Sequence, residues 1–160
     1  MFSTSDIDIS INMNYLDVIQ EIDKRSLGGK PSAEYDKIED KCFSVSQSLK
    51  EFFNGFSLEE KKKAKKVVIF INDLSITIDK VLDKMKPNSY MAWTIGNRNV
   101  NTKEVKNDSI LTELMEAKGG TLFTKLERDI LNKRMPGKNN FSKTMSKEKI
   151  LVFKVNGSGK

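Results

Sequence analysis

Apolar residues recur at helical spacing along most of the chain. Steps of three and four residues predict six helices, at residues 14–25, 33–54, 58–72, 76–85, 109–118 and 122–134. The second is the clearest, because its apolar positions form a single stripe: Tyr35, Ile38, Cys42, Val45, Leu49 and Phe52. In the sixth, Leu122, Leu126 and Ile130 are expected to face inward.

Capping residues support these boundaries. Ser57 and Glu60 have the spacing of a capping box, and Gly55 fits a helix C-cap in the left-handed conformation. Ser75 and Thr121 are expected N-caps of the fourth and sixth helices.

Two stretches lack a helical period. Residues 88–102 predict a loop or a short hairpin around Gly96 and Asn97, and residues 149–155 form the best strand of the chain. We therefore expect a mainly α fold with a minor β element (α+β). The expected organisation is a single helix-rich domain over residues 1–155, with a mobile tail or truncation point at residues 156–160.

Composition excludes several classes of function. The chain has no histidine, which removes Cys/His zinc sites, Ser-His-Asp triads and the commonest general base. Cys42 is the only cysteine, and its spacing predicts a buried structural thiol in a reducing compartment. No apolar run has the length of a membrane span, and the acidic N-terminus excludes a secretory or mitochondrial signal. We therefore expect no enzyme, no cofactor and no metal.

Charge is divided unevenly along the chain. Residues 1–60 hold 6 Lys and Arg against 12 Asp and Glu, whereas residues 61–160 hold 22 against 10, so the second part has a net charge of +12. This asymmetry is typical of a protein that binds a polyanion or an acidic surface through one part. The bland alternative is the lysine bias of an AT-rich genome.

The densest basic run, KKKAKK at residues 61–66, has two interpretations. On a helix its lysines spread around the axis, so it is first interpreted as a solvated surface. Contact with a phosphate backbone is the alternative.

A second candidate is the segment from Trp93 to Asn99. Trp93 is either a core residue or a platform on which a base stacks. Arg98 suits a phosphate or a guanine edge, and the Asn97 and Asn99 amides suit base edges.

A third candidate is the segment between Asp129 and Glu148, which holds five cations and no acid. Pro136 and Gly137 predict a turn, so its cations cannot lie along one regular element. Neither PGK at 136–138 nor GSGK at 157–160 matches a phosphate-binding Walker loop.

Three segments in order then resemble a known family. Residues 76–82 (ITIDKVL), 95–102 (IGNRNVNT) and 133–138 (KRMPGK) resemble the N-terminal RNA-binding domain of the rotavirus translation-enhancing non-structural protein (non-structural protein three). The resemblance covers residues 34 to 150. Gly96 stands where an arginine is expected and Val100 where an aromatic residue is expected, which indicates a distant group.

The resemblance implies an intertwined homodimer in the host cytoplasm. In that family the domain holds the 3′ end of viral single-stranded mRNA in a basic channel. It promotes translation through a C-terminal region, absent here, that recruits the host translation-initiation scaffold; no membrane is involved. The RNA-binding residues are expected to be Trp93, Asn97, Arg98, Asn99, Lys133, Arg134, Gly137, Lys138, Asn139 and Lys143.

Two other classes of function stay open. One is a helical viral or bacterial effector module that binds an acidic host protein surface. The other is a small nuclease or transferase using carboxylates and lysines, which would show turnover with magnesium.

Overall fold

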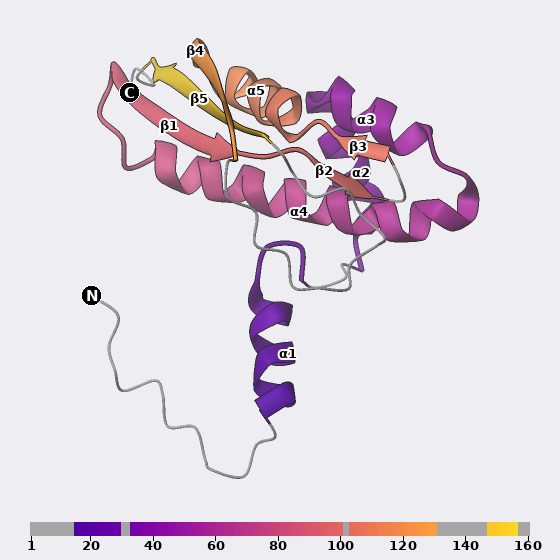
Figure 1. The fold of residues 1–160 in the computed structure, drawn as a ribbon. Coiled ribbons are helices and arrows are strands. Elements are labelled where there is room, and N and C mark those ends of the chain that lie inside the picture. The colour runs from indigo at the N-terminus through magenta and orange to yellow at the C-terminus, as the bar shows by residue number, and fades with distance from the viewer. Residues whose placement is uncertain (1–14, 30–32, 101–102, 131–146, 157–160) are drawn as a thin grey trace.

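The computed structural model describes residues 15–29, 33–100, 103–130 and 147–156. The described residues form five helices and five strands, which confirms the α+β class (Figure 1). In chain order the elements are α1 Tyr15–Arg25, α2 Tyr35–Val45, α3 Gln47–Asn54, α4 Leu58–Leu82, β1 Ser89–Ile95, β2 Arg98–Val100, β3 Lys103–Val105, α5 Asn107–Ala117, β4 Gly120–Asp129 and β5 Lys147–Val155.

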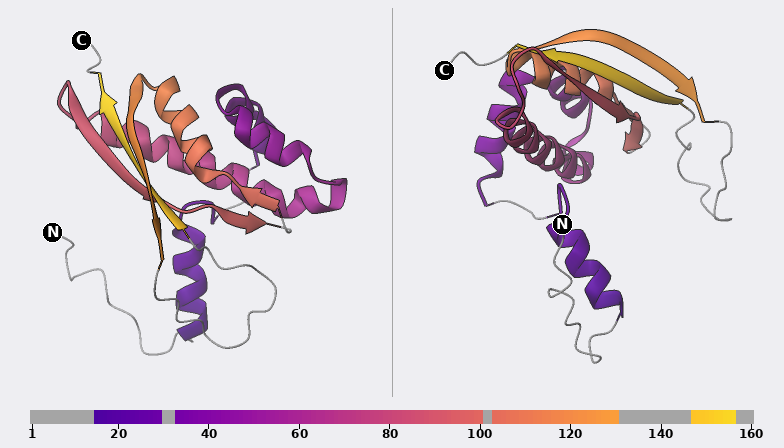
Figure 2. Two further views of the ribbon diagram at one scale, coloured as in Figure 1. Left: turned by 45° about the horizontal axis from the view of Figure 1, so that its top comes forward. Right: turned by 90° about the vertical axis from the view of Figure 1, so that its left-hand side faces the viewer.

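One antiparallel sheet and a helical layer make up the body of the molecule. The sheet has the order β1-β5-β4, so β5 pairs with a strand on each side. Helices α4 and α5 lie against one face of this sheet, with α2 and α3 beside them (Figure 2). Strands β2 and β3 form a separate two-stranded ribbon. Within the described ranges, no helix has the length and apolarity needed to cross a membrane.

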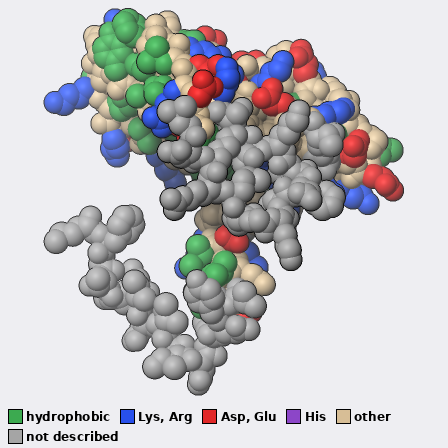
Figure 3. Space-filling view, in the orientation of Figure 1, with side chains coloured by type: hydrophobic (Ala, Val, Ile, Leu, Met, Phe, Trp, Pro, Cys, Tyr) green, Lys and Arg blue, Asp and Glu red, His purple; other side chains and the backbone are tan. Residues whose placement is uncertain are grey.

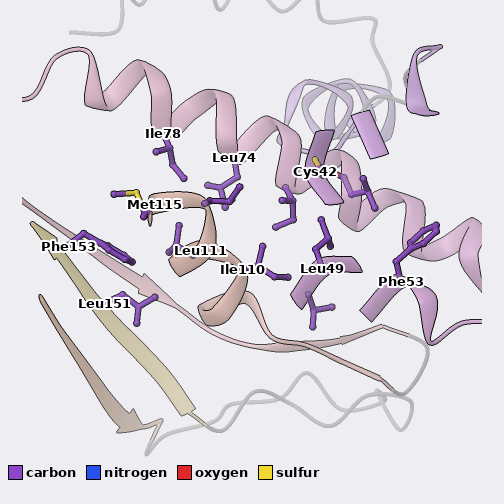
Figure 4. Close-up of a cluster of buried hydrophobic side chains, with 14 of the residues drawn as sticks. Cys42, Leu49, Phe53, Leu74, Ile78, Ile110, Leu111, Met115, Leu151 and Phe153 are labelled. Atoms are coloured by element: carbon purple, nitrogen blue, oxygen red, sulfur yellow. Dashed lines mark hydrogen bonds between the residues drawn. The ribbon is translucent and has the colours of Figure 1, made fainter. Parts of the chain in front are cut away.

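The core lies between the sheet and the long helix α4. One side of α4 contributes Ala64, Val68, Ile71 and Ile78, which are buried at helical spacing. Alternate residues of β5 face them across α5, as the labelled side chains of Figure 4 show. Burying these positions is worth about 1.5–3 kcal/mol for each large side chain.

Cys42 belongs to this core, as its spacing predicts. The thiol is 4% exposed and lies near the Val68 carbonyl of α4. Burial raises the pKa of Cys42 to about 11, so the thiol stays neutral at physiological pH. The prediction of a buried structural thiol is confirmed.

The opposite face of the sheet carries exposed apolar side chains. Tyr90 and Phe123 lie edge to face with ring centroids 5.3 Å apart, and Leu126 lies 55% exposed on the same strand as Phe123. Figure 3 shows hydrophobic side chains gathered at the end of the molecule where the sheet lies. An antiparallel sheet with one solvated face usually places polar residues there, so this face departs from the usual pattern.

The helix predicted over residues 122–134 is wrong. Residues 120–129 form β4, which pairs with β5 from Gly120 opposite Val155 to Asp129 opposite Lys147. The apolar spacing of this stretch fits a helix locally. However, the ladder with β5 satisfies its backbone and places Leu122 opposite Phe153 on the core face. Residues 131–134 of the predicted helix lie outside the described residues.

Two other boundaries also differ from the prediction. The second predicted helix is broken at Ser46, whose hydroxyl accepts a hydrogen bond from Leu49 N and begins α3. The third and fourth predicted helices are instead one continuous helix, α4. Ser75 lies buried in its interior and is therefore not the N-cap of a separate helix. The Ser57–Glu60 capping box at the start of α4 is confirmed.

The predicted loop or hairpin over residues 88–102 is a strand followed by part of a ribbon. Strand β1 occupies residues 89–95 and pairs with β5, and β2 starts at Arg98. The predicted strand near the C-terminus is confirmed as β5. The larger share of strand makes the β element more than the minor one expected.

Helix α5 is tied to the start of α3 by one carboxylate. Glu113 accepts hydrogen bonds from the Ser46 hydroxyl at 2.5 Å, the Ser48 hydroxyl at 2.6 Å and Ser48 N at 3.2 Å. Ser46 is fully buried, so its hydroxyl has no access to water in place of Glu113.

Removing this carboxylate should destabilise the fold. Glu113→Ala leaves the buried Ser46 hydroxyl and the N-terminal end of α3 without their acceptor, so we expect the free energy of unfolding to fall by about 1–3 kcal/mol. Urea denaturation measures this loss. Glu116→Ala is the matched control, because Glu116 is exposed on the same helix. Equal losses in both variants would contradict the assigned role of Glu113.

Candidate functional site

Two adjoining hollows lie along the lysine-rich start of α4. The first, which we call the arginine hollow, has a volume of about 320 Å³, and Lys63, Lys66 and Arg98 contribute to its wall. Its apolar lining consists of Leu27, Val67, Phe70, Val100 and Val105. The second, the lysine hollow, has a volume of about 510 Å³ and is lined by Lys62, Lys65 and Lys66 together with Gly28, Gly29, Tyr35 and Ile69.

Helical spacing explains why these lysines gather. Residues 63, 66, 67 and 70 follow the i, i+3, i+4, i+7 pattern and share one side of α4, while residues 62, 65, 66 and 69 share the adjacent side. A third side of the helix holds Ala64, Val68 and Ile71 in the core. Burial of the apolar side therefore fixes the direction of the lysines.

A close approach between the turn after α1 and α4 closes one wall of both hollows. Gly28 N donates to Asp73 Oδ2 at 2.8 Å. Gly28 has a φ of 76°, and a Cβ at this position would lie 2.9 Å from Phe70 Cβ. Both the backbone conformation and the contact require glycine here.

Two asparagines hold the turn that carries Arg98. Asn107 Nδ2 donates to the Gly96 carbonyl at 2.9 Å, and Asp108 N donates to Asn97 Oδ1 at 3.3 Å. These bonds fasten the turn before β2 to the start of α5. Arg98 then pairs with Val105 across the β2–β3 ribbon and is held beside α4.

A buried carboxylate anchors the start of α5. The Asp108 side chain is 4% exposed and forms ion pairs with Lys125 Nζ at 2.6 Å and Lys149 Nζ at 2.7 Å. Burial raises the pKa of the Asp108 carboxyl, but hydrogen bonds from the two lysines outweigh burial and hold the pKa well below its usual range. Asp108 thus stays ionised and joins α5 to β4 and β5.

The cations of the arginine hollow lack the ion pairs that several other described cations form. Ion pairs occupy Lys118, Lys125 and Lys149. Within the part of the chain that the structure describes, Lys63, Lys66 and Arg98 form no ion pair with a carboxylate. Three positive side chains therefore line one hollow with no carboxylate among its described lining residues, an arrangement that favours an anionic ligand.

The structure separates the residues that the sequence grouped around Trp93. Arg98 lines the arginine hollow, while Asn97 holds the turn before it. Trp93 is half-buried against the core, with Nε1 donating to Met91 Sδ at 2.7 Å, which is the arrangement of the core alternative. Asn99 is half-buried on β2, opposite Glu104.

Six of the expected residues lie outside the described residues: Lys133, Arg134, Gly137, Lys138, Asn139 and Lys143. Lys63 and Lys66 are exposed, as the solvated interpretation of the basic run predicts, and they also line the arginine hollow. The useful signal was the placement of Val67 and Phe70 among these lysines at helical spacing, which gives one side of the helix both charge and apolar area.

Comparisons with known proteins give one informative relative. No protein family and no solved structure matches the chain. The chain is 34% identical over 143 residues to the Type II methyltransferase M.MvaI of Kocuria varians. The match covers 85% of this chain and 32% of the relative, so the chain spans about a third of that protein's length.

This relative overturns the rotavirus resemblance. Segments of six to eight residues carried that resemblance, whereas the similarity to a bacterial methyltransferase extends over 143 residues. The viral RNA-binding function, the viral and host-scaffold partners and the alternative of a host-directed effector are therefore wrong. The expectation that the chain is no enzyme is contradicted as well, since the relative is a methyltransferase. The expected dimer and host-cytoplasmic location lose their basis, and no finding tests them.

The anchoring role of Asp108 predicts how stability depends on pH. Because the folded-state pKa lies below that of an unfolded aspartate, about 3.9, the ion pairs stabilise the fold fully above that pH, and this stabilisation is lost as the pH falls. We expect Asp108→Asn to lower the free energy of unfolding most near pH 7, with a difference from wild type that shrinks below about pH 4.

Urea denaturation at several pH values measures this difference. Asp83→Asn is the control, because Asp83 is exposed and forms an ion pair with its neighbour Lys84. A constant difference between wild type and Asp108→Asn from pH 7 to pH 2 would contradict the account.

Proposed function

We propose that this chain serves a DNA-modifying methyltransferase by binding DNA. The observation that carries the proposal is the 34% identity to the Type II methyltransferase M.MvaI over 85% of the chain. Because the chain spans 32% of that relative, it corresponds to one part of such an enzyme.

The charge distribution supports binding to DNA. A protein that modifies a base in DNA must hold the phosphate backbone while the base is reached, and lysine and arginine supply most of that attraction. The net charge of +12 over residues 61–160 and the lysines and arginine that line the two hollows suit this task. Phosphate contacts of this kind fix the position of a duplex without reading its sequence.

The two hollows do not fit the methyl donor. S-adenosylmethionine, the usual biological donor, carries a positive sulfonium centre, which the cations lining both hollows would repel. The sequence also contains no G-x-G-x-x-G segment of the kind that binds nucleotide cofactors. We therefore propose that the residues of both hollows contact DNA and take no part in methyl transfer.

The proposal predicts salt-dependent binding of duplex DNA by the intact chain. Fluorescence anisotropy with a labelled duplex should show affinity falling as salt rises, with the slope reduced by about 0.9 for each phosphate contact removed. Lys62→Gln with Lys65→Gln, which both line the lysine hollow, should therefore reduce the slope by about 1.8.

The matched control removes the same charge elsewhere. Lys50→Gln with Lys84→Gln changes two exposed lysines outside both hollows and should leave the slope close to wild type. If the two double variants behave alike, DNA is attracted only by net charge. A wild-type chain that fails to bind duplex DNA at low salt would contradict the proposed function.

A further inference from the structure

The arginine hollow combines two kinds of surface that a phosphate alone does not need. Its cations, Lys63, Lys66 and Arg98, have no acidic partner among the described residues. Its remaining wall is largely apolar, with Val67 and Phe70 from α4 and Val100 from β2. A ligand that fits both surfaces has an anionic end and a flat or apolar end.

The size of the hollow favours a compact ligand. Its volume of about 320 Å³ is at the lower end of the range of ligand pockets, which span roughly 300–1,000 Å³. The hollow is also built on fixed elements. Asn107 and Asp108 hold the turn before Arg98, and the Gly28 contact with Phe70 closes the opposite wall. Such a wall is formed before the ligand arrives, so little ordering is needed on binding.

We propose that the arginine hollow binds one nucleoside phosphate, with the phosphate on Lys63, Lys66 and Arg98 and the base against Val67, Phe70 and Val100. The base must be unpaired to reach the apolar wall, since the bases of an intact duplex are stacked inside it. The ligand is therefore a free nucleoside monophosphate or a nucleotide of an unpaired DNA strand. The second source rests on the proposed function, and the first does not.

Charge and hydrogen bonding set the expected preference. A phosphate monoester carries about −1.5 to −2 charges at pH 7, which matches a cluster of three cations. Guanidinium can donate two parallel hydrogen bonds to a phosphate, which a lysine cannot. Arg98 should therefore contribute more than either lysine.

Isothermal titration calorimetry of the intact chain tests the proposal with three probes: deoxyadenosine monophosphate, deoxyadenosine and inorganic phosphate. We expect the monophosphate to bind at least tenfold more tightly than either of the others. Equal affinity for the monophosphate and inorganic phosphate would overturn the proposal, because it would leave only a cationic surface.

Two substitutions test the cationic part and the apolar part of the wall separately. Arg98→Gln should weaken the monophosphate at least about tenfold, since a hydrogen bond to a charged group is lost. Val100→Thr places a hydroxyl in the apolar wall at nearly constant volume, so it should weaken the monophosphate but not inorganic phosphate. Circular dichroism checks that both variants remain folded.

Lys84→Gln is the control, because it removes a charge that lies outside the hollow. If Lys84→Gln weakens the monophosphate as much as Arg98→Gln does, the proposed site is wrong. A short single strand with a 5′-phosphate, titrated beside the free monophosphate, distinguishes the two sources.

Failure of this inference and failure of the proposed function give different results. If duplex DNA binds but the monophosphate binds no more tightly than inorganic phosphate, only the nucleotide site in the arginine hollow is contradicted. If the monophosphate binds with the expected preference but duplex DNA does not bind, the nucleotide site is supported and the proposed function is contradicted.

Discussion

The separation of two sides along α4 is the constraint on which the rest of the structure depends. Over 25 residues this helix buries one side against the sheet and α5, and the buried side includes Val68, Ile71 and Ile78. Because these residues cannot leave the core without a cost of several kcal/mol, the rotation of the helix about its axis is fixed. The direction of Lys62, Lys63, Lys65 and Lys66 follows from that rotation. The apolar spacing of α4 therefore determines both how the core packs and where the basic surface lies.

Electrostatic organisation follows the same division. Where the cations serve the fold, they are paired: Lys125 and Lys149 meet the buried Asp108. In the arginine hollow, Lys63, Lys66 and Arg98 form no ion pair with another described residue. A ligand that neutralises such a cluster binds the folded state selectively and stabilises it by mass action. The same arrangement explains why the hollows suit phosphate and not a sulfonium cation.

Local sequence pattern predicted the elements that are stabilised locally. Three local patterns lie within the elements they predict: the apolar stripe from Tyr35 to Phe52, the Ser57–Glu60 capping box and the apolar run of β5. Residues 120–129 contain no such local signal, because their structure depends on a ladder with β5, whose paired residues lie 18 to 35 positions further along the chain. The break at Ser46 likewise depends on Glu113, which no local pattern reveals.

The candidate site was predicted only in part for the same reason. The sequence predicts Arg98 as a phosphate ligand, but not that Gly28 and Lys63 lie beside it, since both are distant from it in the chain. Trp93 was ambiguous between core and surface, and the register of β1 with β5 places it opposite Leu151 on the core face. The similarity to rotavirus segments misled because short segments carry little information about a fold.

The central claim is that the basic side of α4 and the turn before β2 form the nucleic-acid surface of the chain. Nuclear magnetic resonance of the ¹⁵N-labelled chain, with a short duplex added stepwise, tests it most directly. The account predicts that amide shifts change most in residues 62–70 and 96–100, around both hollows, and little on the exposed sheet face at Tyr90 and Phe123. Shifts concentrated on that sheet face, with the start of α4 unchanged, would contradict the account.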